Sequence, residues 1–340
     1  MRAAFVTKFG PPEVLQVREF PARDPAEGEV RIRTKAIGLN FADVMGRLGV
    51  YPGIPDPPFI PGIELSGVID AVGQSVTSVK EGDRVFGFSP QGACAEQVCV
   101  SSDFVRPIPV MMSFEEGAAF GVTSFSAFHG LRTLANIQRG EKLLLHAAAG
   151  GVGTAALQLC REWGVEVFAT ASTKEKLEVA KNLGASHLVN YTSEDFVEAV
   201  RTKTHGYGID VVMDSVGGRI FKRGWNLLAP MGRYVLYGFA SVTGPRTLNK
   251  LKALRELISV PLIHPPSLVS RNRSLMGFNL YFLSHKTEYF RNMAEELFEL
   301  YRKGALKPVM GATFPFERIA EAHAFLQSRR SIGKVVLVID

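Results

Sequence analysis

A glycine-rich segment, Ala147-Ala148-Ala149-Gly150-Gly151-Val152-Gly153, joins an apolar run to a helical pattern. Glycines let a backbone turn sharply and approach a phosphate, whose charge the free N–H groups of a helix N-terminus can bind. Such a turn is a weak signal alone, but here a strand precedes it and a helix and a second strand follow. The segment therefore predicts contacts with a dinucleotide pyrophosphate at Ala149, Gly150, Gly151, Val152 and Gly153.

The end of the second strand predicts which dinucleotide is bound. NAD-selective sites usually place Asp or Glu there, whereas this chain continues Thr170-Ala171-Ser172-Thr173-Lys174-Glu175-Lys176. Ser172 and Lys176 suit the 2′-phosphate of NADP(H), which a carboxylate would repel. Ser172 also fits an N-cap paired with Glu175, and the two roles are compatible. We expect the cofactor to be NADP(H).

These residues need a parallel sheet to position them. From residue 141 onward, apolar runs at 142–146, 165–170, 187–189, 208–214 and 232–238 alternate with helical patterns. This alternation predicts an α/β fold with a doubly wound, buried parallel sheet. Residues 1–120 instead carry short period-2 runs between Gly and Pro, which predicts a small all-β or barrel-like domain. Ser113-Phe114-Glu115-Glu116 is a capping box that should start a helix extending to about residue 134.

The composition excludes several other classes of protein. A chain of 340 residues with 46% hydrophobic and 21% charged residues is globular and long enough for two domains. Three cysteines cannot form a disulfide framework, which favours a reducing compartment, and we expect the cytoplasm. A net charge of +6 is a weak nucleic-acid signal, so no nucleic-acid partner is expected. The uncharged run 143–160 contains glycines and polar residues and is not expected to span a membrane.

Segment 241–273 does not fit a minimal parallel-sheet unit. It carries six basic residues and one acid, and leucines recur at helical spacing before Pro261. This basic insertion could be a lid over the cleft or a dimer element. Alternatively, its 246–260 stretch could contact an anionic membrane surface weakly.

Several segments together resemble the medium-chain dehydrogenase/reductase superfamily, and within it the zinc-free quinone oxidoreductases. The similarity covers nearly the whole chain. Within that family, the chain resembles most the branch of the synaptic-vesicle membrane protein (vesicle amine transport protein) homologues. The residues that carry this resemblance are 40–43, 157–161, 243–245 and 276–280. The superfamily motifs lie at 38–43, 49–52, 61–64, 82–85, 147–153, 210–214 and 333–337.

The resemblance implies a GroES-like β-barrel catalytic domain at 1–122 and 283–340, and a Rossmann domain at 123–282. It also implies an active site in the cleft between them and a homodimer joined through the Rossmann sheets. Asn40 and Tyr51 would face the nicotinamide and the substrate carbonyl, with Asp43 as an orienting group and Thr123 beside the ring. Further cofactor contacts are expected at Tyr191, Gly238, Phe239, Phe278 and Asn279.

Each of these residues also has a structural interpretation. Asn40 could cap a turn or helix, Tyr51 could be a packed loop aromatic, and Asp43 could be purely structural. Phe278 alone would pass as a core residue. His129 and His146 are expected to be packing residues.

The metal question depends on two substitutions. Zinc-dependent relatives have Cys where this chain has Asn40 and His where it has Ile63, and Glu64 alone is no zinc site. We therefore expect no metal, and a hydride acceptor such as a quinone or α,β-unsaturated carbonyl, whose conjugation spreads the incoming charge. The alternative is an NADP(H)-binding protein of low activity that acts through membrane or protein association.

Overall fold

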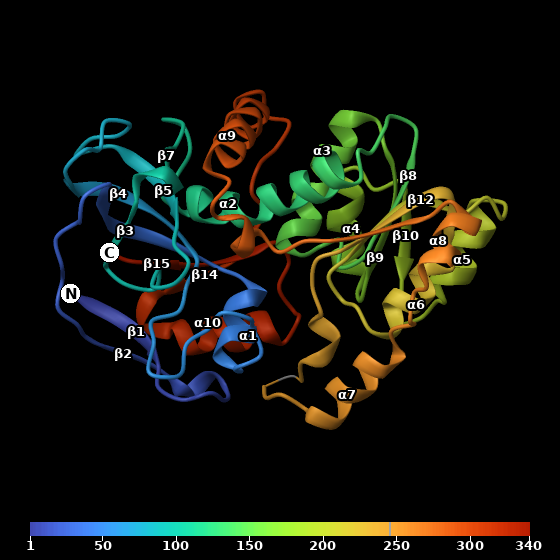
Figure 1. Ribbon diagram of the computed structural model, residues 1–340, viewed down its shortest axis with the longest axis horizontal. Coiled ribbons are helices and arrows are strands. Elements are labelled where there is room, and N and C mark those ends of the chain that lie inside the picture. Colours follow the sequence, from blue (N-terminus) through green and yellow to red (C-terminus); the bar gives the residue numbers. More distant parts are fainter. Residues whose placement is uncertain (245) are drawn as a thin grey trace.

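The computed structural model describes residues 1–244 and 246–340 and contains a β-rich part and a part built on a parallel sheet (Figure 1). The β-rich part holds the blue and cyan strands of Figure 1, and the parallel sheet holds the green and yellow ones. Pro245, which belongs to one of the segments that carry the family resemblance, lies outside the described residues.

The parallel sheet has the strand order β10-β9-β8-β11-β12-β13. In chain order this is 3-2-1-4-5-6, the arrangement of a Rossmann fold. Leu143, Leu144 and Leu145 of the central strand are completely buried, which explains the continuous apolar run. The predicted doubly wound sheet is confirmed. Its strands are β8 (Lys142–Leu145), β9 (Glu166–Ala171), β10 (His187–Asn190), β11 (Ile209–Asp214), β12 (Leu228–Leu236) and β13 (Ser274–Gly277).

Four helices connect these strands: α3 (Gly151–Trp163), α4 (Lys174–Asn182), α5 (Phe196–Lys203) and α6 (Arg219–Trp225). The N-cap of α4 corrects one expectation. Thr173, not Ser172, accepts the hydrogen bond from the N–H of Lys176, at 3.3 Å. The helix begins one residue later than a Ser172 cap would require, so Ser172 is left at the strand end.

The β-rich part is a mainly antiparallel sheet in the order β14-β15-β3-β4-β5-β7, with β6 paired to β3 and a separate hairpin of β1 and β2. Because β15 pairs with β3, the C-terminal segment completes the N-terminal sheet. The expected β-rich fold class is confirmed. Its strands are β1 (Arg2–Val6), β2 (Leu15–Glu19), β3 (Glu29–Leu39), β4 (Glu64–Val72), β5 (Arg84–Phe88), β6 (Gln97–Ser101), β7 (Val105–Pro107), β14 (Met310–Pro315) and β15 (Lys334–Val338).

Helix α2 (Phe114–Phe128) lies between the two sheets and packs against both β3 and α3. The hydroxyl of Ser113 accepts from the N–H of Glu116, and Glu116 accepts from the N–H of Ser113, so the predicted capping box is present. A π-helical turn extends it through His129–Leu134. Because α2 runs through residue 122, the domain limits of 1–122 with 283–340 and of 123–282 stay a prediction.

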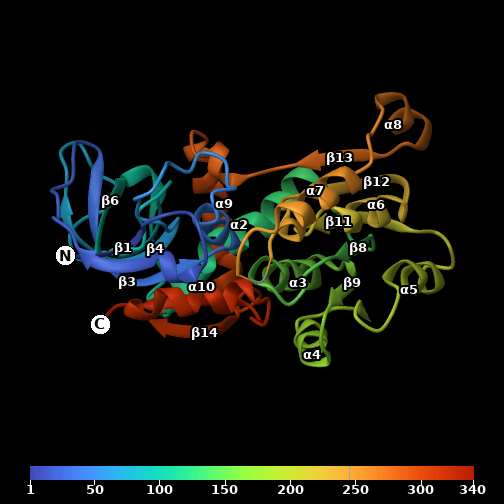
Figure 2. The same cartoon turned by 90° about the horizontal axis from the view of Figure 1, so that it is seen from below.

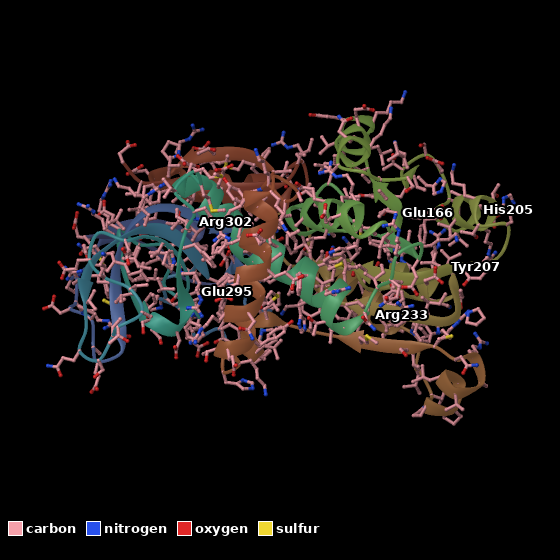
Figure 3. The ribbon with its side chains drawn as sticks, turned by 90° about the horizontal axis from the view of Figure 1, so that it is seen from above. Glu166, His205, Tyr207, Arg233, Glu295 and Arg302 are labelled. Atoms are coloured by element: carbon pink, nitrogen blue, oxygen red, sulfur yellow. The ribbon has the colours of Figure 1, made fainter. Side chains whose placement is uncertain are left out.

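The other helices are α1 (Phe41–Arg47), α9 (Thr287–Arg302) and α10 (Ile319–Gln327). Figure 3 shows Glu295 and Arg302 along the length of α9, whose opposite face packs on α2. Short 3₁₀ turns occur at Pro12–Val14, Ser102–Phe104, Ala240–Val242, Leu280–Leu283 and Phe316–Arg318.

The basic insertion folds as two helices before β13. Helix α7 (Lys250–Ser259) ends before Pro261, as predicted, and α8 (Pro265–Arg271) stands out at the end of the molecule (Figure 2). Leu251, Leu254 and Ile258 of α7 are more than half exposed. Within the described ranges, no helix combines the length and the apolar character needed to cross a membrane.

Candidate active site

A cavity of about 640 Å³ opens where the carboxyl ends of β8, β9 and β12 meet the β-rich part. Open parallel sheets bind their ligands at this position. Every site residue predicted from the sequence lines the cavity except Asp43. The predicted residues that line it are Asn40, Tyr51, Thr123, Ala149, Gly150, Gly151, Val152, Gly153, Ser172, Lys176, Tyr191, Gly238, Phe239, Phe278 and Asn279.

The glycine-rich turn is packed too tightly for larger residues. A Cβ at Gly153 would lie 2.5 Å from the carbonyl oxygens of both Ala147 and Ala148, and one at Gly151 would lie 2.7 Å from Thr123 Cγ2. Helix α3 starts at Gly151, so its first N–H groups have no partner within the helix and face the cavity. The turn therefore fits a pyrophosphate.

Two cations lie at the far end of the cavity, near Ser172 and Tyr191. The Lys176 ammonium donates to the main-chain carbonyl of Arg329, and the Arg329 guanidinium donates to the carbonyl of Ala240, at 2.6 Å. Burial lowers the pKa of Lys176, and the neighbouring Arg329 adds to this. An anion placed here would compensate the positive charges of Lys176 and Arg329 and so oppose the lowering of the Lys176 pKa. This end of the cavity therefore suits a phosphate. Arg329 was not predicted as a site residue from the sequence. It lies 153 residues after Lys176 in the chain, and only the fold brings the two together.

The nicotinamide end would lie near Tyr51, Thr123 and Asn279. The hydroxyl of Tyr51 donates to Asn279 Oδ1 at 3.0 Å, which also accepts from the N–H of Tyr281. Burial raises the pKa of Tyr51, so this hydroxyl stays protonated at neutral pH. The Thr123 hydroxyl donates to the carbonyl of Ala119 at 2.7 Å. Phe278, nearby, stacks on Tyr237 with 5.5 Å between ring centroids.

The Asn40 side chain is held in a polar cluster that sequence reasoning did not foresee. Its amide nitrogen donates to Glu64 Oε1 at 2.8 Å and to the carbonyl of Gly38, while its oxygen accepts from Lys334 Nζ at 2.6 Å. Lys334 also forms an ion pair with Glu64. Lys334 lines the cavity and Glu64 does not.

Asp43 lies behind this cluster, on the first turn of α1. Its carboxylate accepts from the backbone N–H of Asn40 at 2.7 Å. Burial raises the pKa of Asp43 to about 7, against the lowering effects of that hydrogen bond and of Lys334. Asp43 therefore contacts the residue that faces the cavity rather than the cavity itself.

The rest of the cavity wall on this side is apolar and rich in aromatic rings. It is formed by Phe41, Met45, Ile63, Phe88, Phe104, Leu280 and Phe290. Such a wall favours a flat, neutral molecule over a charged one.

The donor set does not fit a zinc ion. Among the described residues, no three His, Cys, Asp or Glu side chains gather closely enough to hold a metal. The carboxylate of Glu64 is already neutralised by Lys334, and an amide stands beside it. A zinc ion needs at least three protein ligands, and the residues around Glu64 do not supply them.

The two histidines differ in their surroundings. His129 Nδ1 lies 2.6 Å from the Tyr289 hydroxyl. His146 Nδ1 lies 3.0 Å from the Thr170 hydroxyl, while its Nε2 has no hydrogen-bond partner in the part of the chain that the structure describes. Burial lowers the pKa of His146, so its ring is neutral at pH 7. Although we expected a packing residue, His146 also lines the cavity.

Two family models match the chain. Residues 26–112 match the alcohol dehydrogenase GroES-like domain, and residues 183–337 match a family described as zinc-binding dehydrogenase. The first falls within the β-rich part. The second begins directly after α4 and extends into β15.

Individual relatives span the whole chain. The rat synaptic vesicle membrane protein VAT-1 homolog is 40% identical over 342 residues, covering 99% of this chain and 84% of its own length. A pig quinone oxidoreductase is 32% identical, covering 100% of this chain and 98% of its own length. The structure of Escherichia coli quinone oxidoreductase complexed with NADPH superposes with a TM-score of 0.90 at 32% identity, and each chain is covered completely.

Proposed function

Because this chain belongs to the medium-chain dehydrogenase/reductase superfamily, close to the VAT-1 homologues and the quinone oxidoreductases, we propose that it is an NADPH-dependent reductase of quinones or α,β-unsaturated carbonyls. The observation that carries this proposal is the make-up of this cavity. It has a glycine-rich helix N-terminus and two cations at one end, and an aromatic wall beside a polar cluster at the other. We further propose that the enzyme works without zinc and in the cytoplasm.

The cofactor is NADP(H), and the chain's own residues fit it. The turn at 147–153 would hold the pyrophosphate, and Ser172, Lys176, Tyr191 and Arg329 would surround the 2′-phosphate. Gly238, Phe239, Phe278 and Asn279 would line the path toward Thr123. When bound, NADPH supplies a hydride.

At the substrate end, the protein positions the carbonyl and excludes water. The aromatic wall would hold a conjugated ring flat, and closure from water strengthens polar contacts within the site. The hydroxyl of Tyr51 lies at this end, and we infer that it turns from Asn279 to orient the substrate carbonyl. The amide of Asn40 lies there too, but both of its N–H groups are donated to Glu64 and Gly38, so it shapes this end of the cavity without donating to the substrate. Since conjugation delocalises the arriving charge onto oxygen, polar donors can replace a metal ion.

The test is a titration of the purified protein with NADPH and with NADH, followed by nicotinamide fluorescence. Oxidation of NADPH is then measured with 9,10-phenanthrenequinone and with a simple enone. Because a charge-assisted contact is worth about 1.5–3 kcal/mol, Lys176→Met should weaken NADPH binding about 10- to 100-fold and leave NADH binding unchanged. Lys174→Met, an exposed lysine outside the cavity, is the matched control. Equal affinity of the wild type for both dinucleotides would contradict the phosphate assignment.

A second function is favoured by the surface of the insertion. Helix α7 leaves Leu251 66% exposed and Ile258 74% exposed, and basic residues lie between them. We propose as the alternative that this surface associates weakly with anionic membranes or with a protein while the reductase activity is low. Co-sedimentation with anionic vesicles at low salt tests it, with Leu251→Ser/Ile258→Ser as the comparison. Recovery of the wild type in the supernatant would exclude the membrane version.

We also propose a homodimer. β13 is one of the two outer strands of the parallel sheet and pairs only with β12 among the described strands, so its other edge could pair with a second copy. Light scattering coupled to size-exclusion chromatography tests this, and a monomer at micromolar concentration would refute it.

A further inference from the structure

Lys334 is a buried cation placed at the wall of the cavity. The side chains of Lys334 and Glu64 are only 4% and 1% exposed, and their ion pair is the most buried one in the part of the chain that the structure describes. An ammonium in such a place is expensive to desolvate, so it is retained only where its charge is compensated.

The protein builds a dedicated pocket for the Glu64 carboxylate. Glu64 Oε2 accepts from the N–H of Val122 at 2.7 Å, and Oε1 accepts from Asn40 and Lys334. Two glycines make room for it, because a Cβ at Gly38 or at Gly121 would lie within 3 Å of Glu64 side-chain atoms. The carboxylate is therefore fixed behind the cavity wall, with its acceptor positions used by the protein.

Lys334 is in turn tied to the glycine-rich turn. The N–H of Gly333, the preceding residue, donates to the carbonyl of Ala149 at 2.7 Å, and Gly333 forms a parallel bridge with Gly150. The aliphatic stem of Lys334 passes close to Gly151. The ammonium is thus placed between the proposed pyrophosphate site and Asn40.

The orientation of the pair leaves a positive end toward the cavity. An ammonium has three N–H donors, and the described contacts use two of them, to Asn40 and to Glu64. Lys334 and Asn40 line the cavity, whereas Glu64 does not. Because Lys334 lines this cavity, we infer that the remaining donor points into it, in a site of low dielectric where an oriented charge acts strongly.

We propose that Lys334 is the electrostatic catalytic residue of this enzyme, stabilising the negative charge that forms on the substrate carbonyl oxygen, and that it also fixes Asn40 beside it. This inference rests on the proposed function. In conjugate reduction, the β-carbon would accept the hydride that NADPH supplies, and NADPH would be oxidised to NADP⁺. The C=C pair then shifts, and the carbonyl oxygen becomes an enolate oxygen. A water proton then completes the reduction at the α-carbon. Lys334 keeps its proton throughout.

The test uses the double variant Lys334→Met/Glu64→Gln together with Lys334→Met alone. The single variant leaves the Glu64 carboxylate buried without its cation, so we expect a lower Tm. The double variant removes both charges and should recover Tm to near the wild-type value. It should also bind NADPH within a few-fold of the wild type, as measured by fluorescence, because the 2′-phosphate and pyrophosphate contacts are unchanged.

Turnover of the double variant separates a catalytic role from a structural one. We expect kcat at saturating NADPH to fall about 100-fold with the enone, as on removal of an oxyanion donor. With the quinone, whose reduced oxygen is less basic, the loss should be smaller, about 10-fold. A merely structural role would not produce this difference between acceptors. Lys142→Met, which breaks the Lys142–Glu166 ion pair at the opposite end of β8, is the control; Figure 3 labels Glu166 on the parallel sheet.

Each outcome decides between the proposals. Wild-type kcat for both acceptors in a folded double variant would overturn the role of Lys334 and leave the proposed function standing. So would a loss confined to NADPH affinity, which would make Lys334 a phosphate ligand. If the wild type itself turns over neither acceptor, the proposed function fails and this inference fails with it.

Discussion

Replacement of Asp43 by asparagine should change the pH dependence of stability in a specific direction. Asp43 is 5% exposed and its carboxylate accepts from the N–H of Asn40. Burial raises its pKa from 3.8 to about 7, partly opposed by Lys334 and reinforced by Glu64. The folded protein therefore binds a proton between these two pH values that the unfolded chain has released.

The sign and size follow from linkage. Stabilisation by this proton is fully present below pH 3.8 and is lost as the pH rises through 7. At about 1.4 kcal/mol per unit, a shift of about three units amounts to about 4 kcal/mol in all. Between pH 5 and pH 8 the loss is about 2–3 kcal/mol. Asp43→Asn keeps the shape and an acceptor oxygen but does not titrate, so it should lack this loss.

The measurement is urea unfolding of both proteins at pH 5 and pH 8, followed by circular dichroism. The free energy of unfolding of Asp43→Asn relative to the wild type should increase by about 2–3 kcal/mol over that interval. Asp56→Asn, at an exposed loop position, controls for the lost charge and should show no such change. If the two proteins keep a constant difference at both pH values, Asp43 does not carry the raised pKa and the burial argument is wrong.

Two further predictions concern a histidine and a glycine. His323 is completely buried, neither ring nitrogen has a partner among the described residues, and burial lowers its pKa to about 3. The wild type should therefore lose about 2 kcal/mol of stability from this residue as the pH falls from 7.5 to 5, below its unfolded value of 6.5. The His323→Leu variant should not lose this stability. If urea unfolding shows the same loss between pH 7.5 and pH 5 in the wild type and the variant, the prediction is refuted. Gly153→Ala places a Cβ 2.5 Å from two backbone oxygens, so NADPH affinity should fall about 100-fold or more and Tm should decrease; unchanged fluorescence titration would show that the turn can relax.

Local signals predicted much of this fold. The continuous apolar strands gave the parallel sheet, and the capping box at Ser113 gave the start of α2. Strand, glycine turn and helix follow one another within about 25 residues, so the pyrophosphate end of the cavity was also accessible to sequence reasoning. These features depend on neighbours in the chain, and local periodicity and turn chemistry record them directly.

The polar cluster depends instead on distant pairings. Lys334 reaches Asn40 across 294 residues and Glu64 across 270. In sequence, Lys334 is the first residue of an ordinary apolar strand, and Glu64 appeared only as a remnant of a metal site. No local pattern distinguishes a lysine that turns inward to a carboxylate from one that extends into solvent. The prediction of the α4 N-cap was wrong for a different reason. Ser172 and Thr173 are adjacent residues that both carry hydroxyl groups, and the sequence does not show which of them has the N-cap backbone conformation that Thr173 adopts.

The strand that carries Lys334 also explains how residues of two different sheets come to line one cavity. β15 pairs with β3 so that Val335 lies opposite Leu39, the residue before Asn40. One residue earlier than Lys334, Gly333 bonds to Ala149 at the glycine-rich turn. The distance from the proposed pyrophosphate site to Asn40 is thus spanned by two consecutive residues, Gly333, which precedes β15, and Lys334, its first residue. Because such a connection is short and hydrogen-bonded, we expect it to hold the cofactor and the substrate carbonyl in fixed register, although their binding residues come from distant parts of the chain. If the proposed function holds, a substitution that displaces β15 should impair cofactor affinity and turnover together, whereas one at the cation end of the cavity, such as Lys176, should impair affinity alone.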